Sequence, residues 1–253
     1  MRLDKYISNA SDYSRSQVKR LIKKAIVEVD GDIITNPATT IATTSKVYLD
    51  GIPIAMPGPR YFMLNKPTNV VSATKDSEHP TAIDLIDEPR TEQLQIAGRL
   101  DIDATGLLLI TDDGQWNHNI TSPHSDCKKT YQVMVAEPLC TTLIQKFQEG
   151  IWLEGEKRRC LAADLNIVDH HHALLTISEG KYHQIKRMFA ALNNHVTTLH
   201  RIQIGNILLD ENLEPGLYRP FTQQEMIQQQ KTQPKVVHPK IVQENIGVTQ
   251  QGA

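Results

Sequence analysis

The sequence is short of the residues that metal, disulfide and membrane proteins depend on. It has three cysteines among 253 residues, an odd number without the paired spacing of a zinc site or a disulfide framework. No apolar run approaches the ~20 residues that cross a bilayer, and the amino terminus lacks the apolar segment of a secretory signal. We therefore expect a cytoplasmic protein with unpaired thiols, no metal site and no membrane partner.

Two nucleotide-binding signatures are also missing, the Gly-x-Gly-x-x-Gly fingerprint and the phosphate loop. Positive charge is not in excess either, because the formal net charge is −2. This balance argues against a protein that binds nucleic acid over its whole surface, although a local basic patch is enough to contact phosphates. An enzyme of this composition would act through its own side chains, and we predict no cofactor.

The densest group of reactive side chains lies in residues 98–106. This stretch holds Arg99, Asp101, Asp103 and two glycines, and four aliphatic residues follow at positions 107–110. The aliphatic run predicts a buried strand that ends at an Asp-Gly turn. Reactive groups are therefore expected beside a rigid element.

Three kinds of chemistry fit the pattern around Asp101. A phosphatase nucleophile loop would follow a buried parallel strand, and residues 95–100 make a poor one. A calcium loop would need a bidentate glutamate at its twelfth position, where Asp112 stands, and usually a polar residue at its ninth, where Leu109 stands. The third possibility is a single nucleophilic aspartate that its neighbours position. A tract of three histidines at 170–172 lacks a spaced partner and is interpreted as a turn.

The first 50 residues are expected to form a separate small module. Asp12 or Ser14 could cap a helix whose apolar residues recur at spacings of three and four. The other side of this helix carries five positive charges: Arg15, Lys19, Arg20, Lys23 and Lys24. Such a run is either a solvated helix face or a surface that binds the RNA backbone.

The remaining chain divides by composition. Residues 51–59 hold three prolines and two glycines, which is typical of a linker. Residues 60–230 intersperse strands and helices without regular alternation, so we predict an α+β domain with a largely antiparallel mixed sheet. Residues 182–191 carry the strongest helix pattern of its second half. From 231 to 253 the chain has no aromatic residue and many glutamines, and we expect a mobile tail.

Five motifs in register resemble the pseudouridine synthases that modify ribosomal RNA. The motifs are Gly98-Arg99-Leu100-Asp101 with its flank, Tyr61-Phe62-Met63-Leu64-Asn65-Lys66-Pro67, Lys129-Thr130-Tyr131, Tyr182-His183-Gln184-Ile185-Lys186-Arg187-Met188, and Pro215-Gly216-Leu217-Tyr218-Arg219-Pro220. The first 50 residues are similar to the small helix-rich RNA-binding module first known from a ribosomal small-subunit protein. This similarity favours the RNA-binding interpretation of the basic helix.

The resemblance implies roles for individual residues. Asp101 matches the catalytic aspartate, Tyr131 the active-site tyrosine, and Lys186 the basic residue that pairs with the aspartate, with the adjacent Arg187 as the alternative. Arg99 is expected to help flip the target base. A cation beside Asp101 is a physical requirement if the site excludes water, because burial alone disfavours the ionised carboxylate.

The resemblance also implies a target and leaves rivals open. It favours members that act on bacterial small-subunit ribosomal RNA, at the uridine called 516 in 16S RNA, free or within an assembly particle. Large-subunit RNA is the alternative target. A noncatalytic assembly factor and a hydrolase are the alternative functions; a glycosidase would need a second carboxylate ~5 to 10 Å from the first. Without an apolar heptad pattern we expect a monomer.

Overall fold

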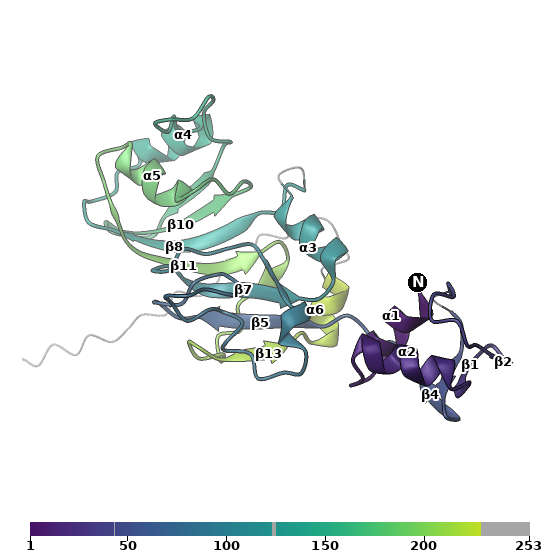
Figure 1. The fold of residues 1–253 in the computed structure, drawn as a ribbon. Helices are drawn as coiled ribbons and strands as arrows, with labels where there is room; N and C mark the ends of the chain where they lie inside the picture. Colours follow the sequence, from purple (N-terminus) through teal and green to yellow (C-terminus); the bar gives the residue numbers. More distant parts are fainter. Residues whose placement is uncertain (43, 123–124, 229–253) are drawn as a thin grey trace, which may run out of the picture. The chain divides into compact units, whose positions relative to one another are not determined.

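The computed structural model describes residues 1–42, 44–122 and 125–228 of the chain. The chain divides into two compact units, Met1–Pro59 and Arg60–Ala253 (Figure 1). The tail expected at residues 231–253 lies outside the described residues.

The first unit contains two helices and a four-stranded antiparallel sheet. The helices are α1 (Leu3–Ala10) and α2 (Arg15–Lys23). The strands are β1 (Val27–Val29), β2 (Asp32–Ile33), β3 (Val47–Leu49) and β4 (Ile52–Ile54), in the order β2-β1-β3-β4. The sequence predicted a helix-rich module, and the structure shows a small antiparallel sheet in addition to the two helices. Since β4 pairs with β3, this unit extends past residue 50 into the segment expected to be a linker.

Local sequence explains how the elements of this unit begin and end. Ser14 caps α2 in a reciprocal capping box, in which its hydroxyl accepts from the Gln17 backbone N–H and the Gln17 side chain accepts from Ser14. Asp30 and Gly31, both at positive φ, form the tight turn between β1 and β2. Ile7 of α1 and Ile22 of α2 are fully buried against the sheet.

The second unit is built on one mixed sheet in the order β13-β5-β7-β11-β8-β10-β9. Its strands are β5 (Tyr61–Lys66), β7 (Thr105–Thr111), β8 (Lys129–Val135), β9 (Asp164–Ile167), β10 (His172–Ile177), β11 (Val196–Ile204) and β13 (Tyr218–Pro220). Of these pairs only β7 with β11 is parallel. Two short strands join the margin, β6 (Gln95–Ala97) on β7 and β12 (Ile207–Leu208) on β11. Residues 95–97, a weak strand candidate, thus do pair in the sheet.

Both faces of the central strand β7 are buried, which explains its unbroken aliphatic run. Leu108 and Ile110 join the larger core, whereas Leu107 and Leu109 join a smaller core on the other face. The second unit also contains three helices and a 3-10 turn between its strands: α3 (Gly114–Thr121), α4 (Thr142–Glu149), α5 (Gln184–Ala190) and η1 (Thr91–Gln93). A last helix, α6 (Gln223–Gln228), follows β13.

Helices α4 and α5 lie together near β8 and β10 (Figure 1). Their contact is aromatic, because the rings of Phe147 and Phe189 lie 5.1 Å apart between centroids. Both rings are fully buried in the larger core. This packing places the amino-terminal end of α5 at a defined position beside the sheet, and the observed helix falls within the range 182–191 indicated by the sequence.

Candidate active site

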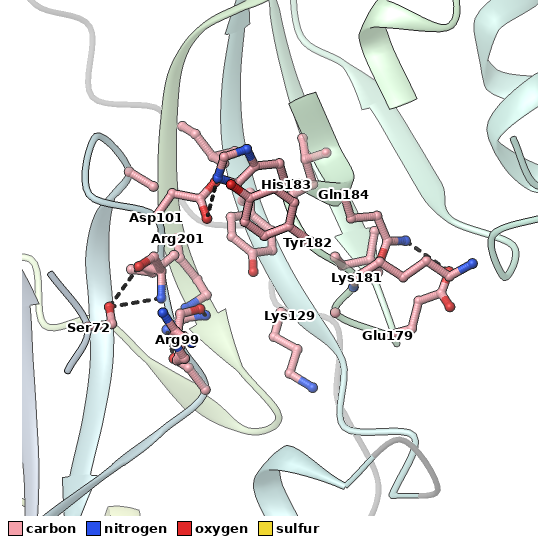
Figure 2. Close-up of a pocket in the computed structure, with 18 of the residues that line it drawn as sticks. Ser72, Arg99, Asp101, Lys129, Glu179, Lys181, Tyr182, His183, Gln184 and Arg201 are labelled. Carbon is pink, nitrogen blue, oxygen red and sulfur yellow. Dashed lines mark hydrogen bonds and ion pairs between the residues drawn. The ribbon is translucent and has the colours of Figure 1, made fainter. Parts of the chain in front are cut away.

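A cavity of about 750 Å³ opens in the second unit where β7 begins and where β8, β11 and the β10–α5 loop come together. Asp101, Tyr131 and Lys186, the three residues expected to carry the chemistry, all line it, as does Arg99. They come from three places in the chain: strand β8 for Tyr131, helix α5 for Lys186, and the loop before β7 for Arg99 and Asp101, which Figure 2 labels. A volume of this size is within the range that holds small organic ligands.

The loop that carries Asp101 is held by its backbone carbonyls. Arg201 of β11, 1% exposed, donates from Nε to Leu107 O at 2.8 Å, from Nη2 to Gly98 O at 2.7 Å and from Nη1 to Arg99 O at 3.2 Å. Ser72 exchanges two hydrogen bonds with the backbone of Leu100. Because one guanidinium satisfies three carbonyls, the loop is tied to β11 at several points.

Lys66, at the end of β5, binds further backbone carbonyls of the same loop. Its buried ammonium donates to Pro67 O and Ala104 O at 2.8 Å and to Ile102 O at 3.3 Å. Burial lowers the pKa of Lys66 to about 8, while the carboxylates of Asp103 and Asp101 act in the opposite direction. Three carbonyl acceptors match the three N–H donors of the charged ammonium.

Asp101 lies between two basic side chains. Lys186 Nζ is 3.5 Å from Asp101 Oδ2. His183 Nε2 is 3.6 Å from Asp101 Oδ1, as the dashed line in Figure 2 marks. The Asp101 side chain is 27% exposed, so it remains accessible from the cavity. Each carboxylate oxygen therefore has one basic nitrogen within 4 Å.

Lys186 is shared between two carboxylates. Its ammonium donates to Asp103 Oδ2 at 2.7 Å, which is closer than its approach to Asp101. This hydrogen bond lowers the pKa of the Asp103 carboxyl below its ordinary value. Asp103, which belongs to the same loop as Asp101, therefore holds the Lys186 ammonium close to that loop.

Arg187, the alternative partner for Asp101, points elsewhere. Its guanidinium donates to Glu156 Oε1 at 3.1 Å and to the carbonyls of Glu154 and Tyr182. It therefore ties the β10–α5 loop to residues 154–156. The structure brings Lys186, and not Arg187, to Asp101.

Tyr131 is buried on β8 with its ring next to Arg201. The guanidinium carbon of Arg201 lies 5.9 Å from the ring centroid, in cation–π range. Tyr131 pairs with Arg201 across the β8–β11 ladder, so sheet register fixes their approach. The exposed side chain of Arg99 forms no ion pair with any residue that the structure describes.

The five basic residues expected to bind RNA belong to the first unit and are not equivalent. Arg15 donates twice to the buried carboxylate of Asp4, which also accepts two hydrogen bonds from Arg2. These bonds, led by those from Arg2, hold the pKa of Asp4 well below its usual range. The other four, Lys19, Arg20, Lys23 and Lys24, are exposed.

Two residues of the site were not singled out by sequence analysis. His183 stood inside a quoted motif, but nothing marked it as a neighbour of Asp101. Arg201 had one available signal, since a lone arginine within the apolar strand pattern of residues 199–204 needs buried acceptors. Within the described ranges no cluster of three or more histidine, cysteine or acidic side chains could hold a metal ion. The histidine tract at 170–172 forms a turn into β10.

Comparison of the chain with models of known protein families identifies the class of enzyme to which this fold and site belong. Residues 60–191 match the model of the RNA pseudouridylate synthase family, and residues 1–54 match the S4 domain. The chain belongs to this family of RNA-modifying isomerases.

Curated relatives share nearly the whole chain. A protein named "Ribosomal small subunit pseudouridine synthase A" from Vibrio parahaemolyticus is 50% identical over 228 residues, which cover 89% of this chain and 98% of the relative. The protein of that name from Escherichia coli K12 is 49% identical over 227 residues. A solved structure titled "Crystal structure of pseudouridylate synthase" is 44% identical, covers 90% of this chain and 99% of its own, and has a TM-score of 0.66. None of the helices in the part of the chain that the structure describes combines the length and the hydropathy of a membrane-spanning segment.

Proposed function

We propose that this protein converts one uridine of 16S ribosomal RNA, uridine 516, to pseudouridine. The relatives named for the small ribosomal subunit support the choice of RNA. At least 97% of each relative's length aligns with this chain, and about half of the aligned residues are identical. The observation that carries the chemistry is Asp101, an accessible carboxylate between two basic groups at the wall of a cavity.

Asp101 makes the covalent contact with the nucleoside. A carboxylate can attack at a sugar carbon, as glycosidases do, provided that it is ionised. Lys186 supplies the positive charge beside it. Attack of the Asp101 carboxylate at C1′ breaks the glycosidic C1′–N1 bond, and the uracil then turns. C5 bonds to C1′ and displaces the carboxylate of Asp101. C5 loses its proton and N1 gains one, so that the product is an isomer of the substrate. No redox change occurs.

Tyr131 and Arg99 act on the base. Tyr131 lines the cavity and is placed to stack on the uracil, with Arg201 fixing the orientation of its ring. Arg99 is exposed at the cavity and has no ion-pair partner in the described structure, so it is available to occupy the space that the extruded uridine leaves in the RNA. The exposed cations of α2 contact the RNA backbone.

Release of tritium from C5-labelled uridine tests this function directly. We would use a 16S transcript, alone and bound to ribosomal proteins, with the parent protein, Asp101→Asn and the matched control Asp103→Asn. We expect release from one mapped uridine with the parent, none with Asp101→Asn, and measurable release with Asp103→Asn. Activity in EDTA would exclude a metal-dependent hydrolase.

Two outcomes would support the rivals. If the parent and Asp101→Asn bind RNA equally and neither releases tritium from either substrate, a noncatalytic assembly factor is the better interpretation. If tritium is released only from 23S RNA, the chemistry stands and the target belongs to the large subunit.

A further inference from the structure

Tyr182 presents an aromatic ring at the mouth of the cavity. It is 77% exposed although it lines the site, and its ring stacks on the imidazole of His183 with centroids 3.8 Å apart and planes 19° from parallel (Figure 2). His183 covers one face of the ring, so the large exposed fraction means that the opposite face is open. In the described part of the chain the Tyr182 hydroxyl has no hydrogen-bond partner.

The loop around Tyr182 is held in place. The Tyr182 carbonyl accepts from Arg187 at 3.1 Å. Gln184 accepts from the Lys181 backbone N–H at 2.8 Å and donates to Glu179 at 2.9 Å. These bonds fix the backbone on both sides of the ring. An exposed side chain on a fixed backbone loses little further freedom when it binds a ligand.

The backbone of His183 is strained in a way that serves the stack. Its φ of 47° places it in the left-handed region, which a residue with a side chain rarely adopts. In this conformation the imidazole contacts Asp101 along its edge and Tyr182 on its face. The ring of Tyr182 is thus one aromatic layer away from the carboxylate.

An open aromatic face on a rigid loop is what unpaired bases stack on. Nonspecific and specific single-stranded RNA sites both use such rings. In the proposed function the target uracil stacks on Tyr131 inside the cavity, so Tyr182 is not needed for that base. Extruding that uridine removes a stacking partner from the base on either side of it.

We propose that the Tyr182–His183 pair is a stacking platform for the base that adjoins the target uridine. The platform replaces the stacking contact that the extruded uridine gives up, so it helps select RNA in which that neighbour is unpaired. This inference rests on the proposed function and extends it to a second base subsite.

Fluorescence of 2-aminopurine, placed on either side of the target in a short RNA, reports stacking without turnover. All proteins would carry Asp101→Asn, with Tyr182 intact or changed to Ala or to Phe, and Trp152→Ala as a control that removes another exposed ring. We expect quenching at one neighbour with Tyr182 and with Tyr182→Phe, loss of that quenching with Tyr182→Ala, and no change with Trp152→Ala.

Kinetics with Asp101 intact separate stacking from positioning. Loss of one stacked base should raise the KM of Tyr182→Ala by about 5- to 150-fold with kcat nearly unchanged, and Tyr182→Phe should restore it. Unchanged KM and unchanged quenching would overturn the proposal. A fall in kcat with constant KM would also overturn it, because Tyr182 would then act only by positioning His183. Since quenching needs no turnover, failure of the proposed isomerase would be seen separately in tritium release.

Discussion

At the scale of single residues, the first question is which basic side chain supplies the positive charge beside Asp101. Lys186 and Arg187 are neighbours in sequence, yet they face different partners. Helical geometry turns successive side chains about 100° apart, so only one of the two can reach the cavity. Substituting each of the two in turn removes one positive charge in both cases, so a difference in activity reports which side chain lies beside Asp101.

We expect Lys186→Met to reduce the rate of tritium release at saturating RNA by about 100-fold or more, because removing a group that stabilises charge at a reacting centre costs on the order of 10²–10³ in rate. Lys186→Arg should recover part of this loss, since it keeps the charge in another shape. Arg187→Met is the matched control, and its rate should fall less than 10-fold. The reverse order of the two effects would assign the partner of Asp101 to Arg187.

A second residue-scale constraint is Gly106, where β7 meets β11. Its φ is +98°, and a Cβ atom at this position would lie 2.8 Å from Arg201 N and still closer to Arg201 O. We expect Gly106→Ala to destabilise the protein by about 3 kcal/mol, from left-handed strain and overpacking together, and to lower Tm by about 10 °C.

Gly114→Ala is the matched control for that change. Gly114 begins α3, has nothing within 4 Å of its Cβ position and has no positive φ. Its substitution should leave Tm within a few degrees of the parent in thermal unfolding. Equal Tm values for the two variants would contradict the close approach of β7 and β11.

At the scale of elements, two strands hold the loop that carries Asp101. β5 contributes Lys66 and β11 contributes Arg201, and both bind backbone carbonyls of residues 98–107. Neither cation needs a carboxylate, because carbonyl dipoles satisfy its donors. The reactive loop is thereby fixed by groups that take no part in the chemistry.

The burial of Lys66 predicts a pH dependence of stability. Its pKa in the folded protein, about 8, lies below the ordinary value of 10.5, so between these values the unfolded chain binds more protons than the folded one. The contribution of Lys66 to the free energy of unfolding is therefore least favourable below pH 8 and rises as the pH increases from about 8 to 10.5.

Urea unfolding of the parent and Lys66→Met at several pH values measures this effect. The parent curve should rise relative to the variant by at most about 1.4 kcal/mol per pH unit in that window. The comparison uses slopes, because the variant also leaves three carbonyls without a donor. Parallel curves between pH 8 and 10 would show that Lys66 keeps an ordinary pKa.

At the scale of the whole molecule, binding and chemistry belong to different units. The S4 domain carries the exposed cations of α2, and the second unit carries the cavity. Arg15 differs from its neighbours because Asp4 already engages it. The effect of removing a cation should therefore depend on whether it is free to meet a phosphate.

Changing Lys19, Arg20 and Lys23 together to Gln should weaken RNA binding and reduce the slope of log affinity against log salt by about 2 to 3, roughly one per phosphate contact. The rate at saturating RNA should stay unchanged. Anisotropy titrations across a salt series measure the slope. Arg15→Gln is the control. It should lower the stability of the S4 domain, because Asp4 loses a partner, and should leave the slope of log affinity against log salt nearly unchanged. An unchanged slope in the triple variant would show that α2 does not face the RNA.

Much of the local structure could be predicted from the sequence because its causes are local. The Ser14 cap, the Asp30-Gly31 turn and the buried run of β7 each depend on residues within a few positions. Strand β6 was harder, because residues 95–97 are weakly strand-like alone and are stabilised by pairing with β7. β4 was taken for linker for the same reason, since its pairing with β3 overrides its central proline.

The sequence by itself determined the family, the two-part organisation and the residues worth testing, because motif order and hydrophobic period are properties of the chain. Only the tertiary structure decided how those residues meet. It placed Lys186 beside Asp101 and Arg187 beside Glu156, brought the unmarked Arg201 under the reactive loop, and stacked Tyr182 on His183. The contacts of Lys186 and Arg201 depend on strand register and helix phase across 83 and 103 residues of separation, which no local pattern encodes. The stack of Tyr182 on His183 joins neighbours in sequence, but it depends on the left-handed backbone of His183.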